Sequence, residues 1–195
     1  MAKPATKKVP RRVRRPEDLD RVDILAVEGM LAMLGTLSGI LRSFRFNSVN
    51  VFANSEEAWA RLTGEPRVKA DVILMDWNAH PLNGETFVRQ LRRAGLPLLA
   101  ETPVITVIAN ADRPTVFAAR DCGVNAVLLR PYSAAQLLEK VMWTLGQDTP
   151  FIRSEAYVGP DRRRFRTEEY LGEKRRIGET DGRDGGPDSA DNPAA

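Results

Sequence analysis

The stretch VILMDWNAHPLNG, residues 72–84, joins an apolar run to an acidic side chain and then to a polar loop. Residues 72–75 are all apolar, which is typical of a strand that is covered on both faces. Asp76 follows directly. Placing an acidic side chain beside four buried residues costs free energy, so an acid at this position indicates a function. The stretch therefore predicts a central parallel strand with a functional carboxylate at its end.

Short β-branched runs alternate with amphipathic segments on both sides of this strand. Strands are expected at 23–27, 48–52, 72–75, 103–108 and 126–129, and helices at 30–44, 55–62, 85–94, 114–121 and 133–145. Asn54 or Ser55 is expected to cap the second helix. Five strands that alternate with five helices predict an α/β fold, a doubly wound parallel sheet covered on both faces.

Reactive groups in such sheets gather at the carboxyl ends of the strands. Glu28 follows the first strand, Asp76 follows the third and Arg130 follows the fifth. One crevice is therefore expected to hold two carboxylates and one cation.

Charge divides the chain into a domain and two arms. Residues 1–16 hold seven cations and no acid, whereas residues 17–146 hold 15 acids and 13 bases. The C-terminal end is rich in Gly, Pro, Ser and Asp. We expect a disordered basic arm at 1–21, a folded domain at 22–146 and a largely disordered tail at 147–195.

The composition argues against membrane and secretory classes. No uncharged apolar run reaches the ~18 residues that a membrane span needs, and no signal peptide pattern follows the basic N-terminus. The single cysteine, Cys122, has no internal disulfide partner, which fits a reducing cytoplasm. We expect Cys122 to act as a small buried hydrophobe.

Several motifs in register resemble response regulator receiver domains. Residues 76–84 are similar to the phosphorylation loop of that family, with a glycine eight positions after the aspartate. Leu129-Arg130-Pro131-Tyr132 resembles the Lys-Pro-Phe signature after strand five. Further matches are Gly123, Leu137-Leu138, Pro103-Val104-Ile105 and Glu57-Ala58. The resemblance spans residues 22–146 and implies the flavodoxin-like fold of chemotaxis-type, single-domain receivers.

The resemblance also implies phosphoryl-transfer chemistry. Asp76 takes the place of the phosphoacceptor, and Arg130 that of the conserved cation that contacts the phosphoryl group or the carboxylates. Receivers hold Mg²⁺, which here implies Glu28, Asp76 and the backbone carbonyl of Asn78 as ligands.

Four positions depart from the family pattern. Gly29 stands where a second acidic residue is usual, and Ile108 where a hydroxyl residue contacts the phosphoryl group. Arg130 replaces lysine, and Val127 replaces the aromatic switch residue. These changes predict a degenerate receiver that binds Mg²⁺ weakly. His80 has no second His or Cys near it, so we expect no metal role for it.

We expect an atypical stand-alone response regulator in cytoplasmic two-component or phosphorelay signalling, because no output domain fits in the ~50-residue tail. It would act through contacts with a histidine kinase or phosphotransfer protein and with a downstream signalling protein. No enzymatic activity is expected beyond phosphorylation and dephosphorylation of Asp76. The uncharged residues 30–41 are expected to form either a tightly packed core helix or a partner surface.

Two other functions compete with this one. The chain could be a phosphorylation-independent scaffold whose basic arms bind nucleic acid or an acidic partner, although the near-neutral domain argues against nucleic acid. An aspartyl-phosphate phosphatase is disfavoured, because Trp77 and Asn78 supply no second acid beside the nucleophile.

Overall fold

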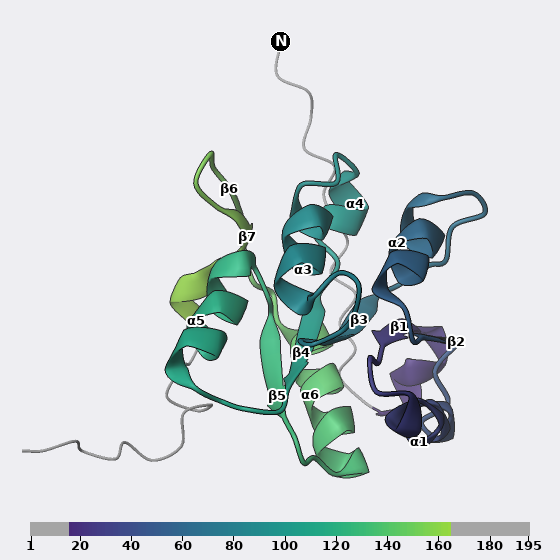
Figure 1. The fold of residues 1–195 in the computed structure, drawn as a ribbon. Coiled ribbons are helices and arrows are strands. Elements are labelled where there is room, and N and C mark those ends of the chain that lie inside the picture. The colour runs from purple at the N-terminus through teal and green to yellow at the C-terminus, as the bar shows by residue number, and fades with distance from the viewer. Residues whose placement is uncertain (1–15, 165–195) are drawn as a thin grey trace, which may run out of the picture.

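A five-stranded parallel sheet forms the centre of the computed structural model, which describes residues 16–164. Its strands are β1 (Asp23–Val27), β2 (Ser48–Phe52), β3 (Val72–Asp76), β4 (Val104–Ile108) and β5 (Ala126–Leu129). They lie in the order β2-β1-β3-β4-β5, so β3 is central and has neighbours on both sides (Figure 1). The predicted doubly wound α/β fold is confirmed.

Helices cover both faces of the sheet, and the alternation along each strand decides which face a residue joins. The main helices are α1 (Leu31–Ser43), α2 (Ser55–Thr63), α3 (Gly84–Arg92), α5 (Arg113–Cys122) and α6 (Ala134–Gly146). Leu25 and Val27 pack with α2, α3 and α5, whereas Ile24 and Ala26 pack with α1 and α6. No helix among residues 16–164 is long and apolar enough to cross a bilayer.

Local signals place these helices close to their expected positions. The Asn54 side chain accepts hydrogen bonds from the backbone N–H groups of Glu56 and Glu57, as the sequence predicts. Cys122 is buried as expected, and burial raises the pKa of its thiol to about 12. The short helix α4 (Pro97–Ala100) was not predicted, and Pro97 at its first turn suits the fixed φ of proline.

Helix α1 is packed in its second half and exposed at its start. Leu37 and Leu41 are buried, but Met30 and Leu31 are 54% and 76% exposed. The first turn of α1 follows the carboxyl end of β1 and lies outside the apolar cluster that covers the second half of the helix. The second half of this helix therefore fits the expected core helix, whereas its first turn leaves apolar side chains on the surface.

Ordered structure extends into both segments that were expected to be arm and tail. Residues Pro16–Arg21 form a 3-10 helix, η1, in which Leu19 is buried. After α6, β6 (Phe151–Arg153) and β7 (Val158–Pro160) form an antiparallel hairpin, followed by the 3-10 turn η2 (Arg162–Arg164). The hairpin lies beside α5 (Figure 1). Residues 1–15 and 165–195 of the expected arm and tail lie outside the described residues.

Arg92 at the end of α3 links this helix, through buried hydrogen bonds, to α4 and to the turn before β5. Its side chain is buried and donates hydrogen bonds to the carbonyls of Ala100, Thr102 and Gly123 and to the side-chain oxygen of Asn125. Burial lowers the pKa of Arg92 to about 10, so the guanidinium stays charged at neutral pH.

The hairpin packs against Arg92 and the turn at Gly123. The Arg92 guanidinium lies 5.7 Å from the ring centroid of Phe151, in a cation–π arrangement. A Cβ atom on Gly159 would approach Gly123 Cα to 3.0 Å, so the two glycines let the backbones meet closely. Arg162 adds an ion pair to Asp121 on α5 at 3.3 Å. The hairpin is thus part of the folded domain.

We expect Arg92→Met to lower the free energy of unfolding by about 3 kcal/mol, because three buried carbonyls lose a donor. Arg89→Met on the same helix is the matched control: Arg89 is exposed and pairs with Glu85 over one turn, which is worth about 0.3–0.5 kcal/mol. Urea unfolding of both variants measures the difference. Equal losses would show that Arg92 does not hold this end of the domain together.

Candidate functional site

Asp76 lies at the carboxyl end of the central strand and is 7% exposed. Its Oδ2 accepts a hydrogen bond from the Gly29 N–H at 3.2 Å, and its Oδ1 accepts one from the Asn78 N–H at 3.1 Å. The first contact joins the ends of β3 and β1, which are neighbours in the sheet. Two backbone groups therefore fix the direction of this carboxylate.

Glu28 follows β1 and is almost completely buried, with 1% of its surface exposed. Its backbone N–H donates to the Phe52 carbonyl at 2.9 Å, which continues the ladder between β1 and β2. Its Oε1 accepts from the Met30 N–H at 3.0 Å, and its Oε2 lies 2.5 Å from Arg130 Nη2. Both oxygens of Glu28 are therefore bound by groups of the chain itself.

Arg130 completes the cluster and directly follows β5. Its backbone N–H donates to the Ile108 carbonyl at 2.9 Å, which places the residue at the carboxyl edge of the sheet, beside the end of β4. The Nη2 atom that pairs with Glu28 also lies 3.8 Å from Asp76 Oδ2. The structure thus brings together the two carboxylates and the cation that the sequence placed at one edge.

Two further residues contact groups of this site, and neither contact was expected. His80 Nδ1 lies 2.9 Å from the Asn78 carbonyl oxygen, the backbone group implied as a metal ligand. The Met30 sulfur lies 3.5 Å from Arg130 Nη1. The two-residue spacing between Asn78 and His80 could have suggested the first contact. No sequence signal indicates the second, because it joins positions 100 residues apart.

The departures from the family pattern have structural counterparts. Ile108 and Val127 are 2% and 1% exposed and belong to the apolar core. Thr106, the one hydroxyl residue of β4, donates to the Met75 carbonyl at 3.0 Å. Strands β4 and β5 therefore offer apolar side chains where a hydroxyl and an aromatic ring are usual in the family.

The arrangement does not fit a ready-made Mg²⁺ site. Among residues 16–164 no group of three or more His, Cys, Asp or Glu side chains is placed to hold a metal ion. Glu28 pairs with Arg130, and the Asn78 carbonyl oxygen faces His80. Gly29 supplies no carboxylate, and a Cβ there would lie 3.1 Å from Ala79 Cα and 3.2 Å from Asp76 Oδ2. The oxygens implied as ligands are engaged by other groups of the chain.

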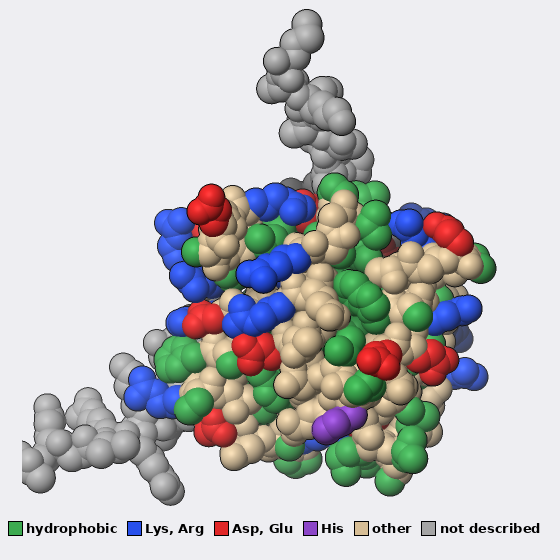
Figure 2. Space-filling view, turned by 45° about the horizontal axis from the view of Figure 1, so that its top comes forward, with side chains coloured by type: hydrophobic (Ala, Val, Ile, Leu, Met, Phe, Trp, Pro, Cys, Tyr) green, Lys and Arg blue, Asp and Glu red, His purple; other side chains and the backbone are tan. Residues whose placement is uncertain are grey.

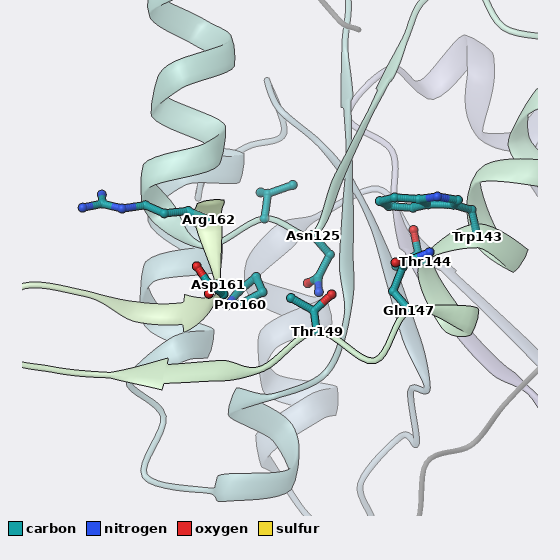
Figure 3. A pocket seen from close by; sticks show the side chains of 9 residues that line it. Asn125, Trp143, Thr144, Gln147, Thr149, Pro160, Asp161 and Arg162 are labelled. Carbon is teal, nitrogen blue, oxygen red and sulfur yellow. The ribbon is translucent and has the colours of Figure 1, made fainter. Parts of the chain in front are cut away.

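A small hollow lies away from this cluster, between α6 and the hairpin (Figure 3). Trp143, Thr144 and Gln147 of α6 and its C-terminus face Asn125 and Asp161 across it. Its volume of about 40 Å³ is enough for a few water molecules. The buried Thr144 hydroxyl oxygen has no hydrogen-bond partner among the described residues, which also suits water.

We expect Gly29→Asp to unfold more easily than Gly29→Asn by about 1–2 kcal/mol at low salt, because it adds a third carboxylate beside Glu28 and Asp76. The two side chains are nearly equal in size, so the tight approach to Ala79 cancels in the comparison. Urea unfolding in EDTA measures the difference, and salt should reduce it. A Gly29→Asp variant as stable as Gly29→Asn would mean that the pocket holds more positive charge than Arg130 supplies.

Known proteins match this chain in sequence and fold. The family model of the response regulator receiver domain matches residues 24–142. Chemotaxis protein CheY-3 of Vibrio cholerae is 31% identical over 121 residues, which are 60% of this chain and 87% of CheY-3. Chemotaxis protein CheY1 of Helicobacter pylori is 26% identical over 123 residues, 63% of this chain and 96% of CheY1.

Solved structures agree with these sequences at the level of the fold. The receiver domain of the sensor histidine kinase PA1611 from Pseudomonas aeruginosa PAO1 has a TM-score of 0.56 and 24% identity, and the match covers 65% of this chain and 99% of that domain. Its crystal structure has a magnesium ion coordinated in the active site cleft. Because the family model spans more than half of the sequence and the sheet has the strand order of the flavodoxin-like fold, this chain belongs to the response regulator receiver domain family.

Proposed function

We propose that this chain is an atypical response regulator that acts through protein–protein contacts, with Asp76 as its phosphoacceptor. Its receiver domain is of the type that serves two-component signalling. The observation that carries the proposal is the cluster at the carboxyl edge of the sheet, where Asp76 ends the central strand beside Arg130 and Glu28. We place the protein in the cytoplasm, which suits its single buried thiol.

The chemistry follows from the position of Asp76. An oxygen of its carboxylate would form a bond to phosphorus while the bond between phosphorus and the histidine nitrogen of the donor breaks. The donor would be a histidine kinase or a phosphotransfer protein. Negative charge on the transferred group needs a nearby cation, and Arg130 is the cation that lies within 4 Å of Asp76 Oδ2 in the described part of the chain.

A partner surface lies next to this pocket. Met30, Leu31 and Met33 are exposed at the start of α1, and Met30 contacts the Arg130 guanidinium. Adjacent exposed apolar side chains on a soluble domain commonly mark a protein contact. We propose that this turn contacts the phosphodonor or the downstream signalling protein.

Charge on the folded domain does not favour nucleic-acid binding. Residues 17–146 hold 15 acids and 13 bases, so their charge is close to neutral. Figure 2 shows side chains of both signs on the face in view, with several basic ones at its upper left. The basic arm that motivates the alternative lies outside the described residues. A gel shift with DNA and RNA at several salt concentrations distinguishes the two, because binding through the arm would weaken steeply with salt.

We expect acetyl phosphate to add one phosphoryl group to the wild-type chain, slowly, and none to Asp76→Asn. Intact mass spectrometry after treatment in Mg²⁺ buffer measures the addition. Asp71→Asn is the matched control. Asp71 directly precedes β3, at the opposite end of the strand from Asp76, and its carboxylate accepts a hydrogen bond from the Asp23 N–H. Modification that persists in Asp76→Asn would remove Asp76 from this role.

We expect phosphorylation of Asp76 to disturb the start of α1 more than strands β4 and β5. Asp76 Oδ2 contacts the Gly29 N–H directly, whereas Ile108 and Val127 have neither a hydroxyl nor an aromatic ring to respond. A ligand shifts a conformational equilibrium only through contacts that differ between the states.

Amide chemical shifts measured before and after acetyl phosphate test this expectation. Residues 28–34 should move most, together with Arg130 beside the phosphoryl group, and residues 112–127 should move little. Asp76→Asn, treated in the same way, controls for changes of buffer. Large shifts confined to 112–127 would show that another residue couples Asp76 to that face.

A further inference from the structure

The cluster at the sheet edge contains one nitrogen atom that serves two acidic side chains. Arg130 Nη2 lies 2.5 Å from Glu28 Oε2 and 3.8 Å from Asp76 Oδ2. A positive group shared between two carboxylates is the arrangement that a bound metal ion would otherwise provide. In this chain the shared cation is covalently part of the protein.

Burial makes the shared cation necessary. The side chains of Glu28 and Asp76 are 2% and 9% exposed, and that of Arg130 is 15% exposed. A buried carboxylate without a partner is strongly destabilising, whereas one with a paired cation and further hydrogen bonds is tolerated. Glu28 has both, because its second oxygen accepts from the Met30 N–H. The folded state is therefore neutralised in part without any ion from solution.

Arginine suits this position better than lysine would. Its guanidinium is planar and permanently charged, and its nitrogens point in fixed directions. While Nη2 faces the carboxylates, Nη1 lies 3.5 Å from the Met30 sulfur at the start of α1. A single ammonium group could not reach both places in this fixed geometry. The guanidinium therefore also fixes the turn that leads from β1 into α1.

We propose that Arg130 is the resident cation of this pocket, so that the fold needs no divalent metal and such a metal binds only by displacing the guanidinium. The proposal concerns binding and stability and is independent of whether Asp76 is phosphorylated. Displacement would also free Met30, so metal binding and the position of the first turn of α1 are linked.

The test compares the wild-type chain with Arg130→Gln, which keeps a planar polar group and removes the charge. Thermal unfolding and Trp77 fluorescence are followed during titration with Mg²⁺ after treatment with EDTA. We expect the wild-type Tm to be the same in EDTA and in millimolar Mg²⁺. Arg130→Gln should be less stable in EDTA, should regain stability as Mg²⁺ rises, and should bind Mg²⁺ at least tenfold more tightly than wild type.

Two controls locate the effect. Glu28→Gln combined with Arg130→Gln removes a metal ligand together with the cation, so the recovery with Mg²⁺ should disappear. Arg120→Gln removes a partly exposed arginine that pairs with Asp121 on α5, and it should behave like wild type toward Mg²⁺. If Arg130→Gln does not fold in EDTA, its refolding on addition of Mg²⁺ is the supporting result.

Arg130→Lys provides a second measurement that does not depend on the stability of the neutral variant. Its charge is retained but its fork is lost, so Mg²⁺ should bind more tightly than to wild type and the Met30 methyl NMR signal should move. The proposal is overturned if wild type binds Mg²⁺ as tightly as the Arg130 variants do. It is also overturned if Arg130→Gln neither loses stability in EDTA nor responds to Mg²⁺.

Discussion

Glu28 and Asp76 are held out of water at the carboxyl edge of a parallel sheet, and their charge has to be offset there. Parallel pairing of β1 with β3 brings the two strand ends together, and the helices on both faces exclude solvent. The backbone N–H groups of Gly29 and Met30 donate hydrogen bonds to the two carboxylates, and Arg130 supplies the positive charge beside them. The position of the turn before α1 follows from these contacts.

A second arginine, Arg92, binds backbone carbonyls, whereas Arg130 binds carboxylates. Arg92 is buried and donates to the carbonyls of Ala100, Thr102 and Gly123. Carbonyl oxygens carry only partial charges, so several dipoles together stabilise this guanidinium. Burial lowers its pKa, and the charge of Glu101 adds an attraction that opposes this shift. Its hydrogen bonds join α3, α4 and the turn before β5 to one point. The hairpin then packs on that point through Phe151.

The sequence was informative wherever a single element decided the outcome. Residues 72–75 predicted a buried strand, and the ends of three strands predicted that Glu28, Asp76 and Arg130 would meet. The hairpin escaped prediction because residues 147–164 lack a strand-like alternation. Its place depends on Arg92 and Gly123, which lie far away in the sequence.

The contacts of His80 and Met30 escaped for the same reason. Side-chain orientation in a loop and contacts across 100 residues leave no periodic signal. The apolar start of α1 was ambiguous, because an exposed apolar turn and a buried one have the same composition. Only the position of that turn relative to the sheet edge decided between them.

The unusual residues of the pocket depend on one another. A second carboxylate at position 29 would crowd Asp76 Oδ2 and add charge that one guanidinium could not offset. The apolar Ile108 fits the core as it is, and a hydroxyl there would lose apolar packing without an obvious partner. Arg130 reaches Glu28 and Met30 together because its nitrogens diverge. The residues at these positions therefore suit one another, and placing one family residue among them would leave a charge or a cavity that the other positions do not compensate.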